Sequence, residues 1–483
     1  MQTARTVSSL DAVFSPESVA VVGASPGKSG QLFLDSLLAC GFQGKIYAVN
    51  SRGEDISGLR AYTSIRDIPG TIDYVVCCIP APAVPQLVKD CAAKEVKALS
   101  VFTAGFSEIG TEEGTRLETE VTRLARETGV RVIGPNCLGV YSPRARFSYT
   151  SDFPNESGHV AFVCQSGGNS VYTTRAAAYR GVRFSKVISY GNACDINECE
   201  LLEYLATDDE TSSVAIYIEG VKNGPRFYRA LKRLASTKPV VVLKGGYTTA
   251  GAHAAASHTG SLAGSNQVWD RLIHQSDAIR VYSLEELVDM LVTLSLLPVP
   301  AGRRVGIFGG GGGATVLGTD DWAKFGFVLP PLPGPIKEEL RRSVPNEAGL
   351  ILHNPIDLSS FAYSERFYAL IKKLLTSEGF ADISVIHIGF GQAAWFSTSV
   401  FDAEINFFKE AVTRIRNEVD RPLVLVMQYL ITGWDWQKGI EDLQRGCADA
   451  GIPVYHSMAS AAQAVDRLLR YYERRNAIQG NLQ

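Results

Sequence analysis

Three segments of this chain each run from a short apolar strand, through a glycine-rich turn, into a helical pattern. They begin at Ser18 (SVAVVGASPGKSGQLFLDSLL), His159 (HVAFVCQSGGNSVYTTRAAAY) and Arg304 (RVGIFGGGGGATVLGTDDWAKF). Glycine allows the unusual backbone angles of such a turn, and the helix that follows points its free N–H groups toward it. Because strands alternate with helical patterns along the rest of the chain as well, we expect an α/β fold built on parallel sheets.

The spacing of these segments predicts three domains. A chain of 483 residues is too long for one ordinary core and, at roughly 150 residues per domain, fits about three. Candidate boundaries are the polar, Pro- and Gly-bearing stretch 141–158 and the short Pro-containing break 295–304. We therefore predict three Rossmann- or flavodoxin-like parallel-sheet domains, which span 1–150, 151–300 and 301–483.

Charge and cysteine content exclude several classes of protein. The 47 Lys and Arg residues against 50 Asp and Glu give a net charge of −3, which does not attract nucleic acid or an anionic membrane. The sequence contains no run of about 18 apolar residues, the length that a membrane-spanning helix needs, and the start of the chain has no signal-peptide pattern. The nine cysteines are scattered without a CxxC pair, which predicts a reduced, cytoplasmic protein without a cysteine metal site.

The first glycine turn predicts a nucleotide site. Gly23, Gly27 and Gly30 follow a strand and open a helix, an arrangement that can place phosphates on a helix N-terminus. Glycines can also occur in such a turn only because the backbone must change direction there, without any ligand. The next predicted strand ends in Asn50 followed by Arg52, where dinucleotide folds usually have Asp or Glu. Asn and Arg accept a ribose phosphate, which CoA has and NAD lacks, so CoA is favoured and NADP stays open.

The segment 240–265 (VVVLKGGYTTAGAHAAASHTGSLAGS) leaves a strand and continues with hardly a bulky side chain. A stretch so poor in apolar anchors cannot pack a conventional core, and we expect it to be mobile. His258 lies within it and can act as a nucleophile that is carried between sites, although a histidine of a surface loop is the alternative. We assign His253, five residues earlier, to that alternative.

A phosphorylated imidazole has about two negative charges and needs donors that hold it. The second and third glycine turns could aim helix N–H groups at one phosphoryl group. We therefore predict phosphate-binding residues at Gln165, Ser166, Gly167, Gly168, Gly310, Gly311 and Gly312. A carboxylate must also orient the imidazole ring, and Glu219, at the end of the apolar strand AIYIEGV, is the candidate. The alternative for Glu219 is a salt-bridged strand end.

Taken together, these segments resemble a known family, the α subunits of ADP-forming acetyl-CoA (acyl-CoA) synthetases. That group belongs with succinyl-CoA synthetase in the NDP-forming acyl-CoA synthetase superfamily. The resemblance covers about residues 12–470, and its most specific piece is ASHTGSLAGS. It also rests on VAVVGAS…GKSG, GPNCLGV, CQSGG, SYGN, DDETSSVAIYIEGV and HNPIDL.

The resemblance implies a CoA-binding domain followed by two succinyl-CoA-synthetase-like domains. It implies a reversible reaction in which acyl-CoA, phosphate and ADP give acid, CoA and ATP through an acyl phosphate and a phosphohistidine. The phosphohistidine would be His258, supported by Glu219 as the second catalytic residue. CoA contacts would come from Gly23, Ser25, Lys28, Gly30, Asn50, Arg52, Pro80 and Asn136.

The resemblance also implies a partner. In the family, ADP or ATP binds an ATP-grasp domain. After HNPIDL this chain has only about one more α/β domain, and it contains no GxxxxGK[ST] motif. We therefore expect a heteromer with a separate ATP-grasp β subunit that holds ADP or ATP with Mg²⁺, and no ATP synthesis by this chain alone.

Three departures from the family pattern leave the acyl substrate open. The second turn reads CQSGGNS rather than SQSG, Glu200 stands where an aspartate is frequent, and Gly309–Gly313 replaces a GGPG turn. A CoA-dependent acyl or carbamoyl transferase without nucleotide chemistry is one alternative function. An acyl-CoA-sensing regulatory subunit and an NADP oxidoreductase are two others.

Overall fold

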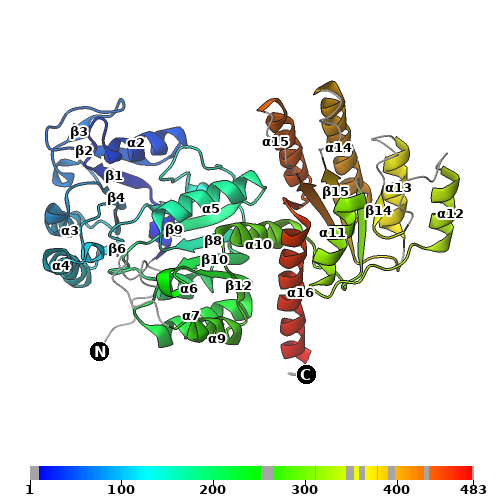
Figure 1. Ribbon diagram of the computed structural model, residues 1–483. Helices are drawn as coiled ribbons and strands as arrows, with labels where there is room; N and C mark the ends of the chain where they lie inside the picture. The colour runs from blue at the N-terminus through cyan, green and yellow to red at the C-terminus, as the bar shows by residue number, and fades with distance from the viewer. Residues whose placement is uncertain are drawn as a thin grey trace. The chain divides into compact units, whose positions relative to one another are not determined.

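The computed structural model describes residues 10–251, 265–309, 312–343, 353–357, 365–377, 379–389, 398–428 and 434–480. Within them the chain forms two six-stranded sheets and one five-stranded sheet, with helices between the strands (Figure 1). The expected α/β fold class is confirmed. By its internal contacts the chain divides into two compact units, Met1–Ala178 with Arg183–Leu287, and Tyr179–Val182 with Val288–Gln483.

The first sheet is parallel throughout and has the order β3-β2-β1-β4-β5-β6. Its strands are β1 (Ser18–Val22), β2 (Lys45–Val49), β3 (Ala61–Tyr62), β4 (Tyr74–Cys77), β5 (Ala98–Val101) and β6 (Arg131–Ile133). Helix α2 (Ser29–Ala39) covers one face, and α3 (Val84–Ala93) and α4 (Glu112–Thr128) cover the other (Figure 1). The chain order reverses between β1 and β4, and ligands of open α/β sheets bind at the carboxyl ends of the strands at such a point.

The second sheet has the order β12-β11-β10-β8-β9-β7 and lies in the same unit as the first. Its strands are β7 (Gly139–Tyr141), β8 (Val160–Cys164), β9 (Phe184–Ser189), β10 (Ser213–Ile218), β11 (Val240–Lys244) and β12 (Ile279–Val281). Its helices are α5 (Gly167–Tyr179), α6 (Glu198–Leu205), α7 (Gly224–Thr237) and α9 (Asn266–Gln275). Strand β7 lies inside the range predicted for the first domain, yet it pairs antiparallel with β9. The chain therefore passes from the first sheet to the second between β6 and β7.

The third sheet, in the second unit, is parallel with the order β14-β13-β15-β16-β17. Its strands are β13 (Val305–Gly309), β14 (Ile356–Asp357), β15 (Ile383–Gly389), β16 (Leu423–Gln428) and β17 (Val454–Tyr455). Its helices are α11 (Gly312–Ala323), α12 (Gly334–Ser343), α13 (Glu365–Thr376), α14 (Thr398–Glu418), α15 (Trp434–Asp449) and α16 (Met458–Gly480). Helix α10 (Leu284–Leu296) precedes this sheet, and α1 (Asp11–Phe14) begins the described chain.

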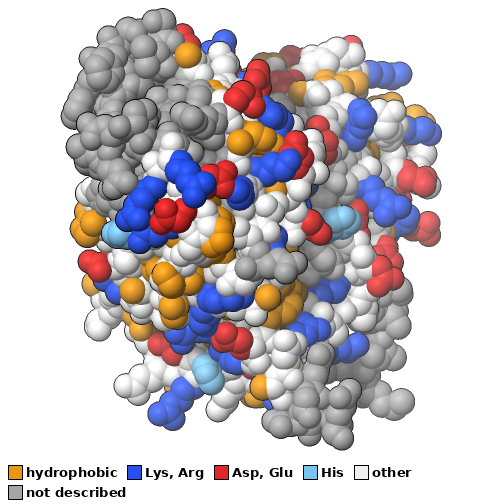
Figure 2. Space-filling view, turned by 90° about the vertical axis from the view of Figure 1, so that its right-hand side faces the viewer, with side chains coloured by type: hydrophobic (Ala, Val, Ile, Leu, Met, Phe, Trp, Pro, Cys, Tyr) orange, Lys and Arg blue, Asp and Glu red, His pale blue; other side chains and the backbone are white. Residues whose placement is uncertain are grey.

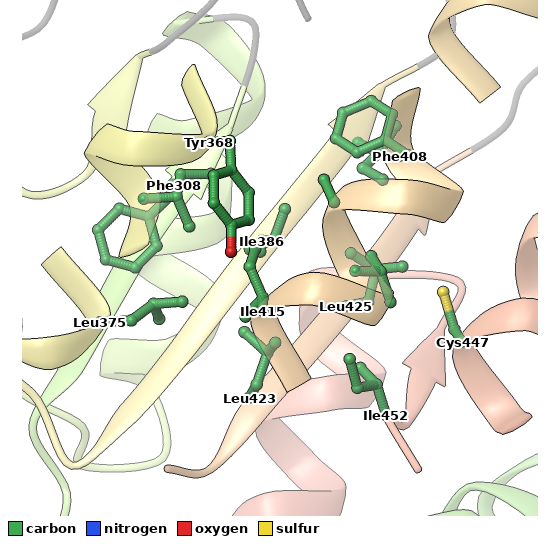
Figure 3. Close-up of a cluster of buried hydrophobic side chains, with 14 of the residues drawn as sticks. Phe308, Tyr368, Leu375, Ile386, Phe408, Ile415, Leu423, Leu425, Cys447 and Ile452 are labelled. Atoms are coloured by element: carbon green, nitrogen blue, oxygen red, sulfur yellow. The ribbon is translucent and has the colours of Figure 1, made fainter. Parts of the chain in front are cut away.

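One face of the third sheet forms a continuous apolar core with α13 and α14 (Figure 3). Phe308 and Ile386 from neighbouring strands belong to this core together with Tyr368 of α13 and Phe408 of α14, and all four are buried. Each fully buried apolar side chain of this size contributes about 1.5–3 kcal/mol relative to an exposed one. The segment HNPIDL adds a polar brace, because Asn354 Nδ2 donates to the carbonyls of Val305 (2.8 Å) and Pro330 (3.0 Å).

Basic and acidic side chains alternate on the face shown in Figure 2 and form no extended field of one sign there. This mixture agrees with the small net charge of the chain and offers no basic track of the kind that binds nucleic acid. None of the described helices combines the length and apolar composition that a membrane span requires.

Candidate functional site

A cavity of about 680 Å³ opens at the point where the first sheet reverses its strand order. Five of the residues predicted to bind a nucleotide line it: Gly23, Ser25, Lys28, Asn50 and Pro80. The cavity volume is in the range of ordinary small-molecule sites, about 300–1,000 Å³. The carboxyl ends of β1, β2 and β4 therefore bring together residues that lie far apart in the sequence.

Glycine is required where β1, its turn and α2 touch. Gly23 has a φ of +93°, and a Cβ added there would lie 2.6 Å from the Cys78 carbonyl oxygen. A Cβ added at Gly30 would lie 2.3 Å from the Gly23 carbonyl oxygen. The turn after β1 therefore lies directly against the end of β4, and the first turn of α2 lies directly against the end of β1, at the cavity. In the described chain no side chain caps that turn, and Lys28 stands at the N-cap position, so free N–H groups and a cation lie where phosphates can bind.

Asn50 serves the turn after β2. Its Oδ1 accepts hydrogen bonds from the backbone N–H groups of Arg52 and Glu54, both at 3.1 Å, and its Nδ2 donates to the Glu54 carbonyl at 2.8 Å. The side chain is buried, with 6% exposed. Arg52 lies on this turn, is 77% exposed and pairs with Glu54 at 3.6 Å. Arg52 does not line the cavity as described, so its contact with a ligand phosphate stays a prediction.

Sequence reasoning missed the opposite wall of the cavity. Thr63 and Ser64 follow the two-residue strand β3, and Gln86 and Asp90 lie on α3. Arg66 donates to Asp90 at 2.8 Å and offsets its negative charge beside a site proposed for anions. A two-residue strand has no periodic signal, and nothing in the pattern of α3 points to a ligand, so only the fold reveals this wall.

The β6–β7 connection, residues 134–138, links the first sheet to the second. On one side the backbone N–H of Asn136 donates to the Thr103 carbonyl at 3.1 Å. On the other side the N–H of Leu138 donates to Ser189 Oγ at 3.1 Å, and a Cβ added at Gly167 would lie 3.2 Å from Leu138 Cγ. The connection thus spans from the carboxyl end of the first sheet to the first residue of α5.

The segment SYGN packs on this connection. A Cβ added at Gly191 would lie 2.2 Å from the Pro135 carbonyl oxygen, and the Asn192 N–H donates to that same oxygen at 3.0 Å. The Asn192 side chain donates to Glu118 Oε2 of α4 at 2.9 Å. Asn136, predicted as a CoA contact, lies here rather than in the cavity lining.

Gln165 and Glu219 meet beside the first turn of α5. Gln165 Oε1 accepts from the backbone N–H groups of Glu219 (2.7 Å) and Gly220 (3.3 Å). Tyr217 OH donates to Glu219 Oε1 at 3.1 Å. Burial, together with the Glu219 charge, raises the pKa of Tyr217, so the phenol stays protonated and able to donate. The Glu219 side chain is 7% exposed, and these contacts fix its backbone and one oxygen.

Ser166, Gly167 and Gly168 form the turn between β8 and the body of α5. Ser166 Oγ accepts from the Asn169 N–H at 3.3 Å. A Cβ added at Gly168 meets no described atom within 4 Å, so the first turn of α5 is open on that side. The predicted phosphate turn at 165–168 therefore lies next to Glu219 and to the β6–β7 connection, within one compact unit.

Glu200, a departure from the family pattern, has a structural role. The Arg131 side chain of β6 is 6% exposed and pairs with Glu200 at 2.8 Å and with Asp195 at 3.0 Å. A buried guanidinium needs such carboxylate partners.

His258 and His253 lie outside the described residues, and so do Gly310 and Gly311. Gly312 begins α11 in the second unit. Roles for all of these residues in phosphoryl transfer stay predictions. Within the ranges that the structure describes, no group of three or more His, Cys, Asp or Glu side chains could hold a metal ion.

Comparison with known proteins gives consistent results. A family model described as a CoA binding domain matches residues 17–143, and one described as a succinyl-CoA ligase like flavodoxin domain matches residues 157–294. The α subunit of acetate–CoA ligase [ADP-forming] I from Pyrococcus furiosus is 35% identical over 96% of this chain and 98% of its own length. Acetate–CoA ligase [ADP-forming] I from Archaeoglobus fulgidus is 34% identical over 96% of this chain and 64% of its own length.

A solved structure is similar over nearly the whole chain. It is the dinucleotide forming acetyl-coenzyme A synthetase 1 of Ca. Korarchaeum cryptofilum, in complex with phosphate and ADP. The TM-score is 0.80 and the sequence identity 30%, over 98% of this chain and 99% of that chain.

Proposed function

This chain belongs to the family of ADP-forming acetate–CoA ligases, and on that premise we propose that it is the subunit that binds CoA and carries the phosphoryl group on His258. It is an acid–CoA ligase of the NDP-forming class. The reaction is acyl-CoA + phosphate + ADP ⇌ acid + CoA + ATP. The observation that supports this proposal best is the β6–β7 connection, which joins the strand ends beside the cavity to the α5 turn and Glu219.

The chemistry divides into three transfers. An oxygen of phosphate attacks the thioester carbonyl, the C–S bond breaks, and CoA leaves as the thiol with a proton from phosphate. A ring nitrogen of His258 then attacks the phosphorus of the acyl phosphate, and the acid leaves with the electron pair of the broken P–O bond. Finally a β-phosphate oxygen of ADP takes the phosphoryl group and the N–P bond breaks, which restores the imidazole and gives ATP.

Residues of this chain support each transfer. The first turn of α2 and Lys28 hold CoA phosphates at the cavity. The α5 turn at 165–168 donates N–H groups to the phosphoryl group. Gly310, Gly311 and Gly312 stay proposed as further phosphate contacts. Glu219 accepts a hydrogen bond from the other ring nitrogen of His258, which favours the tautomer that attacks and stabilises the charge that develops.

We expect Gly30→Ala to weaken CoA binding by about 10- to 100-fold. The added methyl group would lie 2.3 Å from the Gly23 carbonyl oxygen, so α2 must move away from β1, and such overpacking costs about 1–3 kcal/mol. Isothermal titration of the purified variant with CoA measures the effect. Leu32→Ala, on the same helix and 68% exposed, is the matched control and should bind CoA as the wild type does.

The comparisons support a partner for the nucleotide step. The Pyrococcus furiosus relative is named as an α subunit, and the Archaeoglobus fulgidus relative contains sequence beyond the 64% that this chain matches. We propose that an ATP-grasp β subunit binds ADP or ATP with Mg²⁺, whose charge would offset that of the transferred phosphoryl group. All nine cysteines are free, which fits the reducing cytoplasm as the location.

A labelling experiment tests the proposal. The purified chain is incubated with radiolabelled phosphate and acetyl-CoA and should acquire label that is acid-labile and base-stable. Addition of the β subunit and ADP should then move the label into ATP. Other acyl-CoAs in place of acetyl-CoA identify the acyl group that the enzyme prefers.

Three other outcomes would contradict parts of the proposal. Label in free acyl phosphate, with none on the protein even when the partner is present, would indicate a CoA-dependent transferase. CoA binding without any phosphorolysis would indicate a sensing subunit. Synthesis of acyl-CoA from acid, CoA and ATP by this chain alone, at normal turnover, would show that no partner is needed.

A further inference from the structure

Two carboxylates beside the first sheet share the side-chain amide of Asn192. The amide donates to Glu108 Oε2 at 2.5 Å and to Glu118 Oε2 at 2.9 Å. Glu108 follows β5 in a short 3₁₀ turn, Glu118 lies on α4, and Asn192 follows β9 of the second sheet. Asn192 and Glu118 are both 8% exposed. The contact therefore joins the loop after β5 to the loop after β9 within one compact unit.

The same two carboxylates hold the backbone of the loop after β5. Glu108 Oε1 accepts from the N–H groups of Gly105 (2.6 Å) and Phe106 (3.1 Å). Glu118 Oε2 also accepts from Ser107, through its hydroxyl at 2.5 Å and its backbone N–H at 3.4 Å. Gly105 has a φ of +105°, a conformation that glycine adopts most readily. The direction in which the chain leaves β5 is thus set through Glu108 and Glu118.

Lys222 holds the loop after β9. It lies between β10 and α7, and its Nζ donates to the carbonyls of Asn192 (2.9 Å) and Ala193 (3.3 Å). It also pairs with Glu118 at 3.5 Å. Ala193 has a φ of +54°, which is unfavourable for a residue with a Cβ and persists only where neighbours hold it. We name Glu108, Glu118, Asn192 and Lys222 the junction.

The junction lies between the cavity and the α5 turn. The strand order β1-β4-β5-β6 places the loop after β5 between the cavity and the β6–β7 connection. On the other side, the Tyr190 N–H donates to the carbonyl of Cys164 at 3.0 Å, directly before Gln165. Contacts between strand ends thus run from the cavity through the junction to the α5 turn, all within described residues.

The junction is polar where an apolar contact could also join two sheets. Removal of carboxylates and an amide from water costs free energy, and apolar side chains of similar volume often replace such groups without loss of stability. Hydrogen bonds are directional, however, so two carboxylates on one amide specify a single relative position of the two loops. The junction therefore contributes precision of position more than stability.

From this geometry we infer that the junction is a positioning device for acyl transfer, which keeps the thioester of a bound acyl-CoA within reach of phosphate at the α5 turn. The inference rests on the proposed roles of the cavity and of residues 165–168. Attack needs the two reacting atoms about 3–3.5 Å apart, and a misplacement of about 1 Å can cost about 100-fold in rate. The transfer between His258 and the nucleotide uses no CoA, so the junction should not affect it.

The test uses the chain with its β subunit and compares two single-turnover rates of protein labelling. One starts from radiolabelled phosphate and acetyl-CoA and includes acyl transfer, whereas the other starts from ATP labelled at the γ-phosphate and omits it. Asn192→Ala should slow the first rate by about 10- to 100-fold and keep the second within about twofold of wild type. Lys222→Met, at a side chain that is 59% exposed and thus tolerant of substitution, should slow the first rate by about three- to tenfold.

A second asparagine separates positioning from folding. Asn197 Oδ1 accepts from the N–H groups of Cys199 (3.1 Å) and Glu200 (3.3 Å) at the start of α6. Asn197→Ala removes this helix cap and should lower the melting temperature, yet it should leave the ratio of the two labelling rates unchanged. The affinity for CoA should stay at the wild-type value in all three variants.

Wild-type rates in Asn192→Ala and Lys222→Met would overturn the inference. Equal slowing of the two rates, or a loss of CoA affinity, would also overturn it, because the junction would then serve the fold alone. Absence of label on the wild-type protein from either source would instead overturn the proposed function itself.

Discussion

A His258→Ala variant should acquire no acid-labile phosphate from acetyl-CoA and radiolabelled phosphate, and its complex with the β subunit should make no ATP above background. Alanine has no nitrogen to attack the acyl phosphate, so the phosphoryl group has no carrier between donor and acceptor. Loss of a covalent nucleophile typically lowers kcat by about 10⁴- to 10⁶-fold. The rate of label incorporation and the rate of ATP formation measure this directly.

The same segment offers a matched control. His253 lies five residues before His258, and His253→Ala should be labelled at the wild-type rate. Both variants should bind CoA with unchanged affinity, because the cavity is formed by the ends of β1, β2 and β4. Persistent acid-labile label on His258→Ala would assign the phosphoryl carrier to another residue.

Replacement of Glu219 by glutamine should slow labelling of the protein by about 10²- to 10⁴-fold, while the affinity for CoA stays unchanged. The amide has the shape of the carboxylate and can still accept from Tyr217 OH, so the geometry is retained. The amide has no negative charge, however, and no longer favours one tautomer or stabilises a positive imidazole. The effect should fall on kcat rather than on KM for acyl-CoA.

A carboxylate on a helix beside the same sheet provides the comparison. Glu203 of α6 pairs with Arg226 at 2.7 Å, and both side chains are partly exposed, so Glu203→Gln should cost at most about 1 kcal/mol of stability and leave labelling intact. If Glu219→Gln kept the wild-type labelling rate but lost thermal stability, the carboxylate would be a structural strand end. That outcome would leave the orientation of His258 to a different group.

Local sequence was sufficient to predict the glycine turns that follow β1 and β8. Glycines at 23 and 30 are required by contacts of 2.6 Å and 2.3 Å between a hypothetical Cβ and a backbone oxygen. The Gly30 contact acts within the turn, whereas the Gly23 contact involves Cys78 at the end of β4. Both glycines nevertheless belong to a visible local pattern, in which an apolar strand precedes glycine and a helix follows. For the same reason Glu219 could be proposed from its place at the end of an apolar strand.

Residues that act through distant neighbours could not be found in this way. Asn50 was predicted as a phosphate contact, and its side chain also braces the turn that presents Arg52 and Glu54. Tyr217 and Gln165 fix Glu219, yet Gln165 precedes Glu219 by 54 residues. Their contact depends on the parallel pairing of β8 with β10, which no local pattern specifies.

The sequence by itself thus determined the α/β class, the strand, turn and helix units, and the chemical character of the candidate residues. Backbone sterics and side-chain periodicity act over short distances, so both can be recognised from residues that are close in the sequence. Only the tertiary structure decided that β7 joins the second sheet, that residues 134–138 run from the carboxyl end of the first sheet to α5, and that Gln165 meets Glu219. These contacts arise from strand order and register, which are set by the packing of whole elements rather than by any one segment.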